Sequence, residues 1–286
     1  MRFERRDHPS RVLTVLAPVG AIVAALLVSG LLIALAGANP IRAYGLILKG
    51  AFGSRLGLSE MLTRATPLIL TGLAAAVAFR ARLWNIGGEG QFYLGALGVT
   101  AFGMIPAVAA MPAGVVIPLS MAAGAVAGMI LLLVPLGLRL KFGVDEVVTT
   151  LLLNFVAVLF VSLMIDGVMK DPLAFGWPQS VPVPDSAVLP KLMDRTRLHV
   201  GLLIAAAMAV VVWWLQSRTV FGIRARAAGL NPRAAAFAGV PLGTTLIAVA
   251  CLSGGLAGLA GAIEVMGVKG YVTTDLSPNY GYSGIV

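Results

Sequence analysis

Residues 83–95 read Leu-Trp-Asn-Ile-Gly-Gly-Glu-Gly-Gln-Phe-Tyr-Leu-Gly and interrupt an otherwise apolar chain with amides, a carboxylate and glycines. A bilayer tolerates a broken segment only where it is buried in protein or lines a water-filled path, because exposed backbone groups find no hydrogen-bond partner in lipid. The stretch therefore predicts a binding or path segment within a membrane protein. The candidate residues are Asn85, Gly87, Gly88, Glu89, Gly90 and Gln91.

The composition of the whole chain also indicates a membrane protein. Of 286 residues, 59% are hydrophobic and 12% are charged, and the mean hydropathy is +0.95, whereas soluble domains carry about 25% charged residues. The net charge of +9 does not indicate nucleic acid, because the arginines are scattered between apolar runs rather than gathered on one face. A lone cysteine, Cys251, and two distant histidines, His8 and His199, predict neither a disulfide nor a metal site.

Apolar runs long enough to cross a bilayer recur along the chain and predict an all-α polytopic membrane protein with about seven transmembrane helices in a single domain, 1–286. The first run is longer than the apolar region of a secretory signal, so we interpret it as a retained helix. The runs are residues 12–36, 62–79, 90–110, 113–138, 147–165, 200–215 and 244–266.

The basic residues near the ends of these runs predict the orientation. Lysines and arginines favour the cytoplasmic side, and their distribution gives a small excess when residues 1–11 are cytoplasmic. Segment 37–61 is then external and contains an interfacial helix over 39–57. The proline-rich segment 167–199 is an external loop, which is either a docking surface or a connector, and 217–243 is cytoplasmic.

Small residues predict where helices pack closely. Backbones in lipid approach one another where glycine and alanine repeat along one helix face. The ridges expected to pack in this way are Gly254, Gly255, Gly258 and Gly261 in one run, and Gly124 and Gly128 in another.

The segment 218–243 is too polar to cross a membrane and predicts a structured loop. We expect Gly229 to end a first short helix in the left-handed conformation, Asn231 to cap a second helix that starts at Pro232, and Gly239 to stop it. The second helix, 232–238, presents alanines and Phe237. That surface suits insertion into a groove on another protein, with a plain amphipathic connector as the alternative.

Three motifs in this order resemble the permease subunits of ABC importers for nucleosides and simple sugars, within the branched-chain amino acid and ribose type. They are Asn-Ile-Gly-Gly-Glu-Gly-Gln at 85–91, Gly-Val-Asp-Glu-Val-Val-Thr-Thr-Leu-Leu-Leu-Asn at 143–154, and Ala-Gly-Leu-Asn-Pro-Arg-Ala-Ala-Ala-Phe-Ala-Gly at 228–239. The resemblance covers nearly the whole chain. The 85–91 motif looks most like the nucleoside branch, with simple sugars next.

The resemblance implies a multi-pass protein of the cell membrane that pairs with a second permease, with a heterodimer favoured. It also implies an external solute-binding lipoprotein and two cytoplasmic ATP-binding subunits, which contact a coupling helix in the loop. The residues implied for this coupling are Arg224, Gly229, Asn231, Pro232, Ala235, Phe237 and Gly239. Such permeases continue beyond a second glycine-rich motif at 277–286, so we expect this chain to be truncated at its carboxyl end.

The chain itself carries no phosphate-binding Gly-x-x-x-x-Gly-Lys-Ser/Thr pattern and no catalytic constellation, so we expect no ATP hydrolysis, no enzyme activity and no cofactor. Glu89 either lines a path with Gln91 or locks the broken helix by accepting backbone N–H groups. Asn154, with Asp145 and Glu146, could pair with Arg139, Lys141 or the ATPase. The aromatic residues Trp84, Phe92 and Tyr93 either stack on a solute ring or are ordinary interfacial side chains.

Two alternatives remain open from the sequence. Arg80 and Arg82 favour an inner turn for the 85–91 motif, whereas a re-entrant break would carry the motif back into the membrane. A secondary, ion-coupled transporter is the other function to consider, with broken helices at 85–91 and 277–284 that bind solute and ion together.

Overall fold

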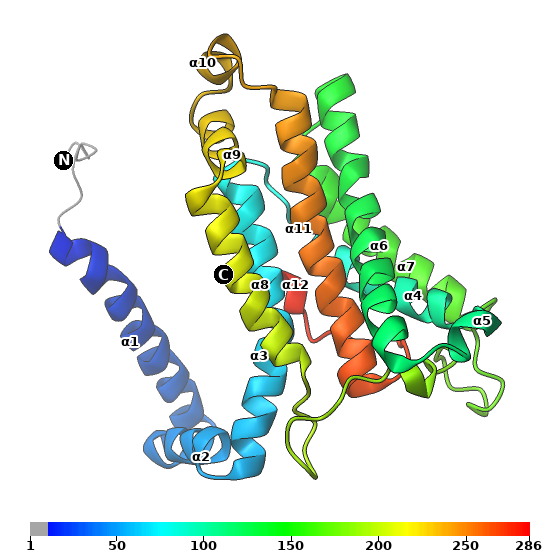
Figure 1. The fold of residues 1–286 in the computed structure, drawn as a ribbon. Helices are drawn as coiled ribbons and strands as arrows, with labels where there is room; N and C mark the ends of the chain where they lie inside the picture. Colours follow the sequence, from blue (N-terminus) through cyan, green and yellow to red (C-terminus); the bar gives the residue numbers. More distant parts are fainter. Residues whose placement is uncertain (1–10) are drawn as a thin grey trace. The chain divides into compact units, whose positions relative to one another are not determined.

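The computed structural model describes residues 11–286, and the chain divides into two units, 1–58 and 59–286, which are taken separately here. The predicted cytoplasmic segment 1–11 lies almost wholly outside the described residues. Within the described part the regular elements are helices, joined by loops that contain two isolated β-bridges (Figure 1). The all-α membrane fold is confirmed, because six described helices are long and apolar enough to cross a membrane.

The first unit contains α1 (Arg11–Leu35) and α2 (Pro40–Phe52). Asn39 caps α2 by accepting hydrogen bonds from the backbone N–H groups of Ile41 and Arg42, at 3.0 and 3.1 Å. The Tyr44 hydroxyl donates to the Leu26 carbonyl oxygen at 2.6 Å and joins the two helices. α2 buries no residue and ends before the predicted residue 57, and its interfacial position stays a prediction.

The second unit is built around three helices: α4 (Gly88–Gly103), α6 (Ala113–Phe142) and α11 (Leu242–Glu264). Around them lie α3 (Arg55–Arg80), α7 (Glu146–Asp166) and α8 (Gly201–Arg218). The predicted count of seven spans is not confirmed. The third predicted span, 90–110, forms the 16-residue α4, which stops at Gly103, and the short α5 (Pro106–Ala109).

Glycines set the spacing of the three central helices, as the sequence predicts. A Cβ on Gly258 would meet the Gly124 carbonyl oxygen, and one on Gly261 would overlap the Phe92 carbonyl oxygen. Gly128 likewise faces Gly254. Because no side chain separates these backbones, α11 packs directly on α4 and α6.

Different elements form the two ends of the second unit. α9 (Val220–Leu230) and α10 (Pro232–Phe237) lie at one end (Figure 1). Loop 167–199, with the short η1 (Asp185–Ala187), lies at the other end, in yellow-green in Figure 1. This loop is tied down, because Val183 N–H donates to the Gly270 carbonyl at 2.8 Å and Leu189 N–H donates to the Met266 carbonyl at 2.9 Å. Both acceptors lie in or next to the π-helical turn η2 (Val265–Lys269).

His199, at the end of that loop, predicts a pH-dependent stability. The imidazole is 1% exposed, and its Nδ1 accepts a hydrogen bond from Gly201 N–H at 3.1 Å. Burial lowers the pKa of His199 to about 4, against about 6.5 for an unfolded chain. The contribution of His199 to the free energy of unfolding is therefore fully present above about pH 6.5. It decreases below that pH because the imidazole binds a proton in the unfolded state but not in the native state. The loss is about 2 kcal/mol at pH 5.

The measurement is a series of thermal unfolding curves of the detergent-purified protein between pH 7.5 and pH 5. We expect His199→Gln to flatten the pH dependence by the amount due to this group, whatever its effect on stability at neutral pH. An unchanged slope in the variant would show that the imidazole is not the group that titrates.

Candidate functional site

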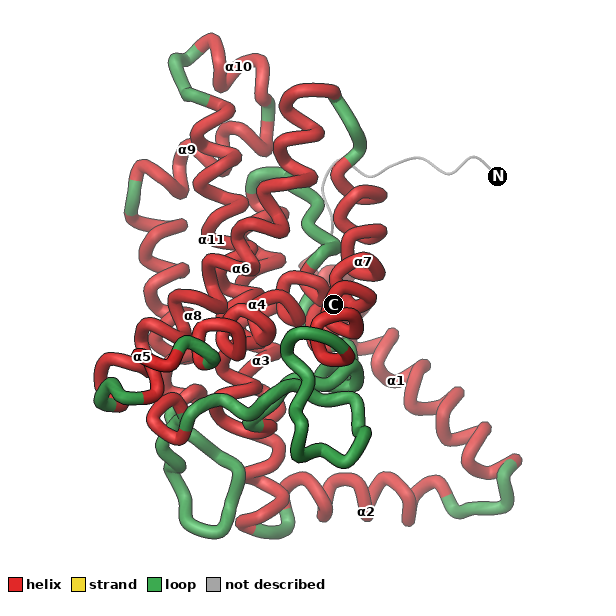
Figure 2. The backbone as a smooth tube through the Cα atoms, turned by 90° about the vertical axis from the view of Figure 1, so that its right-hand side faces the viewer, coloured by secondary structure: helices red, strands yellow, loops and turns green. Residues whose placement is uncertain are grey.

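The 85–91 motif lies part-way along the helical bundle of the second unit. α3 ends at Arg80, Arg82 adopts a left-handed φ of 50°, and the chain runs irregularly until α4 begins at Gly88. Figures 1 and 2 both place the start of α4 between the two ends of the bundle. The segment therefore breaks the chain inside the bundle rather than at its end, and the re-entrant position that we predict for it in the membrane stays a prediction.

Two amide side chains of this broken segment form hydrogen bonds with each other. Asn85 Nδ2 donates to Gln91 Oε1 at 2.9 Å, and Gln91 Nε2 donates to Asn85 Oδ1 at 2.8 Å. Asn85 also accepts from Gly87 N–H at 3.0 Å and donates to Ser253 Oγ of α11 at 3.0 Å. Both amides are buried, so their hydrogen-bonding groups are used within the protein.

Asn154 of α7 forms hydrogen bonds with the same broken segment. Its Oδ1 accepts from Gly90 N–H at 2.8 Å, and its Nδ2 donates to the Ile86 carbonyl at 2.8 Å and to the Tyr282 hydroxyl at 2.9 Å. Of the pairings predicted at this end of α7, the one between Glu146 and Arg139 is confirmed as an ion pair. Asn154 does not pair with Arg139 or Lys141, because it lies further along α7 and faces the motif.

A second broken segment meets the first. α12 (Tyr280–Ser283) follows Asn279, which has a left-handed φ of 67°. Gly281 N–H donates to Glu89 Oε2 at 2.7 Å, and a Cβ on Gly281 would overlap the backbone nitrogen of Glu89. Glycine is therefore required where the two segments cross.

A cavity of about 430 Å³ opens beside this crossing. Glu89, Asn154 and Tyr282 line it, together with apolar side chains of α7. Of the three aromatic residues predicted as candidates for ring stacking, Phe92 is fully buried and does not line this cavity. Tyr93 lines the cavity and donates its hydroxyl to the Thr274 carbonyl at 2.7 Å. Trp84 is half-exposed and contacts the ring of Phe79.

At the α9 and α10 end, the local signals of the loop form as predicted. Asn231 Oδ1 accepts from Ala234 N–H at 3.1 Å, Pro232 occupies the first turn of α10, and Gly239 has a φ of 82°. Phe237 is 97% exposed and Arg224 is also exposed.

Two loop residues differ from expectation. Gly229 is not left-handed, so its predicted role in ending α9 is wrong. A side chain there would overlap the Arg80 carbonyl oxygen, and glycine lets α9 approach the end of α3. Ala235 is buried and faces the protein rather than an outside surface.

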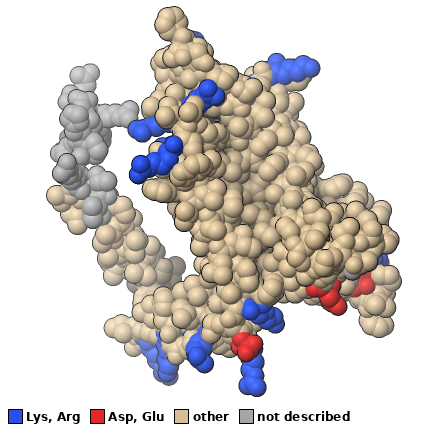
Figure 3. Space-filling view, viewed as in Figure 1, with Lys and Arg blue, Asp and Glu red and all other residues tan. Residues whose placement is uncertain are grey.

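Basic side chains gather at this same end of the unit (Figure 3). Arg82 and Arg139 line a cavity of about 370 Å³ there with Gly229 and Pro232. The loop of α9 and α10 therefore stands on a basic surface that the ends of α3 and α6 share.

Long apolar helices, with two broken segments crossing inside them, define a polytopic membrane transport protein. The family model described as "Branched-chain amino acid transport system / permease component" matches residues 57–286. The chain belongs to this permease family.

Relatives that this chain matches over most of their length support this assignment. The "Glucose ABC transporter permease protein TsgB13" of Haloferax volcanii is 36% identical over 278 residues, which are 94% of this chain and 72% of the relative. The "Guanosine ABC transporter permease protein NupP" of Bacillus subtilis is 31% identical, over 96% of this chain and 79% of the relative. The "Nucleoside ABC transporter permease protein NupB" of Lactococcus lactis is 32% identical, over 95% and 76% respectively. No solved structure matches the chain.

The chain is thus a permease subunit of an ABC transporter, as the resemblance implies, and the secondary-transporter alternative is not supported. Sequence reasoning missed Ser253 and Tyr282 as partners of the broken segment. A serine within a small-residue ridge and a tyrosine after a glycine carry no local signal for such a role.

Proposed function

We propose that this chain forms the solute path of an ATP-driven importer for nucleosides or simple sugars in the cell membrane, with its amino terminus in the cytoplasm. Support for the solute class comes from the glucose, guanosine and nucleoside permeases that it resembles over most of their length. The basic end with α9 and α10 is then cytoplasmic by the positive-inside rule.

The observation that carries the coupling role is the exposure of Phe237 on a capped helix. A phenylalanine that is 97% exposed on a soluble surface is unusual for so large an apolar side chain. We assign it to a groove on a cytoplasmic ATP-binding subunit. Arg224 lies on the exposed side of α9 and would contact the same subunit, whereas Gly229, Asn231, Pro232, Ala235 and Gly239 shape the loop that presents it.

The broken segments serve as a scaffold beside the path. Asn85 and Gln91 satisfy each other, and Gly87, Gly88 and Gly90 allow the backbone of the break to approach its neighbours. Glu89 holds α12 in place through Gly281 N–H. Of this motif, Glu89 reaches the cavity of about 430 Å³, so the motif positions the wall of the path more than it binds solute.

The transport cycle follows from these roles. Two ATP-binding subunits approach each other when they bind ATP, and α10 transmits that movement to the ends of α3 and α11. A second permease, in a heterodimer, completes the central path, and an external lipoprotein delivers the solute at the end with loop 167–199.

The test is Phe237→Glu in the assembled transporter. Loss of a buried aromatic anchor at an interface typically weakens binding by about 2 kcal/mol or more, which is roughly 30-fold. We expect the ATP-binding subunits to dissociate on purification and ATP-dependent uptake into vesicles to fall by a similar factor. Phe237→Leu, which keeps an apolar side chain, should retain most of both.

Uptake and subunit association that survive Phe237→Glu would refute the coupling role. Uptake in vesicles that depends on an ion gradient rather than on internal ATP would refute the proposed class of transport.

A further inference from the structure

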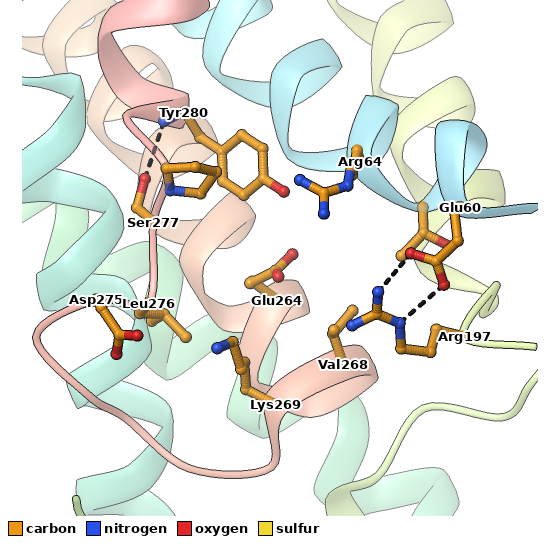
Figure 4. Close-up of a pocket in the computed structure, with 12 residues that line it drawn as sticks. Glu60, Arg64, Arg197, Glu264, Val268, Lys269, Asp275, Leu276, Ser277 and Tyr280 are labelled. Atoms are coloured by element: carbon orange, nitrogen blue, oxygen red, sulfur yellow. Dashed lines mark hydrogen bonds and ion pairs between the residues drawn. The ribbon is translucent and has the colours of Figure 1, made fainter. Parts of the chain in front are cut away.

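A third cavity, of about 380 Å³, lies between α3, the end of α11 and the segment that leads into α12 (Figure 4). It lies toward the end of the unit with loop 167–199, because Arg197 of that loop and Lys269 of η2 line it. None of its charged residues has a role in the function proposed above.

The charges that line this cavity balance. Three carboxylates, of Glu60, Glu264 and Asp275, face three cations, of Arg64, Arg197 and Lys269. Among these, Glu60 and Arg197 form a two-point ion pair, with Arg197 Nε donating to Glu60 Oε1 at 2.8 Å and Nη2 donating to Oε2. That pair closes one wall, and within residues 11–286 Glu264, Arg64 and Lys269 form no ion pair and remain for a ligand.

Among the charged residues that line this cavity, Glu264 has the strongest requirement for a ligand. Its side chain comes from the last turn of α11 and is only 6% exposed. Within residues 11–286 it accepts no hydrogen bond and forms no ion pair. Figure 4 shows its carboxylate pointing into the cavity, between Arg64, Lys269 and Tyr280. A carboxylate that has left bulk water and has no hydrogen-bond partner in the protein favours a donor that enters the cavity beside it.

Because acidic and basic side chains both line the cavity, they favour a ligand that can donate and accept hydrogen bonds. A hydroxyl both donates and accepts, so two adjacent hydroxyls can donate to a carboxylate while they accept from a guanidinium or an ammonium group. A ligand with a net charge would leave groups of its own sign unpaired in this balanced set. The ring of Tyr280 adds a flat apolar wall next to Glu264, which suits the face of a sugar ring.

We infer that this cavity is a solute site that binds the vicinal hydroxyls of a sugar or ribose ring between Glu264 and Arg64. The inference rests on the proposed function, because the solute class comes from there. It adds a place where solute binds before it reaches the broken helices. Ser277 lines this cavity and also the cavity beside Glu89, so the segment that leads into α12 separates the two.

The test measures binding to the complete detergent-purified transporter without its external lipoprotein, by isothermal titration. The probes are guanosine and glucose, each paired with an analogue that lacks adjacent hydroxyls, 2′,3′-dideoxyguanosine and 1,3-dideoxyglucose. We expect the transporter to bind at least one parent compound, at least tenfold more tightly than its analogue. Glu264→Gln and Arg64→Gln should each weaken the parent at least tenfold and remove the preference.

Asp194→Asn is the matched control, because Asp194 is an exposed carboxylate of loop 167–199 that lies outside the cavity. It should bind as the wild type does. If Glu264→Gln fails to purify, Arg64→Gln decides the outcome, since Arg64 is exposed and its replacement opens no buried space.

Equal binding of parent and analogue, no binding of either parent, or wild-type binding by either folded variant overturns the inference. Uptake distinguishes this failure from failure of the proposed function. If ATP-dependent uptake of guanosine or glucose persists while the binding prediction fails, only the site is wrong. If the wild type transports neither, the proposed solute class is wrong.

Discussion

Replacement of Gly261 by alanine is expected to prevent correct assembly of the central helices. Gly261 of α11 lies against α4, where an added Cβ would overlap the carbonyl oxygen of Phe92. Since that atom belongs to the backbone, no side-chain rotation can relieve the overlap, and the two helices must separate. Overpacking of a well-packed interior typically costs about 1–3 kcal/mol, and more where backbone must move. Separation also disturbs Glu89 and Gln91, which lie one turn or less from Phe92.

The measurement is the yield of monodisperse protein after solubilisation, together with its thermal unfolding midpoint. Gly243→Ala on the same helix is the control, because a Cβ there meets no atom within 4 Å. Alanine in place of an unconstrained helical glycine stabilises by about 0.5–1 kcal/mol. Equal behaviour of the two variants would show that α11 and α4 do not pack as closely as described.

Replacement of Asn154 by leucine is expected to abolish uptake and to lower stability markedly. The change removes the acceptor for Gly90 N–H and the donor to the Ile86 carbonyl, both in the broken segment. Leaving the buried Gly90 N–H without an acceptor costs about 1–3 kcal/mol, and the part-buried Ile86 carbonyl adds a smaller cost. The bond to the Tyr282 hydroxyl is lost as well, so the two broken segments are no longer held to α7.

Uptake into vesicles and thermal unfolding should be measured together for this series. Asn154→Asp keeps an acceptor for Gly90 but loses both donors, so we expect it to lie between the wild type and Asn154→Leu. Val156→Leu, on the exposed side of the same helix, should leave both quantities unchanged. Full uptake by Asn154→Leu would mean that the break holds its shape without α7.

Features that depend only on neighbouring residues could be predicted from the amino-acid sequence alone. Runs of apolar residues specify helices of spanning length, and the cap of α10 follows from Asn231, Pro232 and Gly239, because all of its contacts lie within a few residues. The glycine ridge of α11 was also predictable, since residues that repeat along one helix face must meet a neighbour.

Tertiary structure decided which distant groups meet. Glu89 and Gly281 are 192 residues apart in the chain, and no local pattern in either segment names the other. Gly229 was predicted to end α9 in the left-handed conformation. Glycine is instead required there because the end of α3 lies beside it and leaves no room for a side chain. Likewise, Glu264, Arg64 and Arg197 come from three separate segments and share one cavity only after folding. Local hydrogen bonds are fixed by spacing in the sequence, whereas these contacts depend on how the helices pack, which spacing alone does not specify.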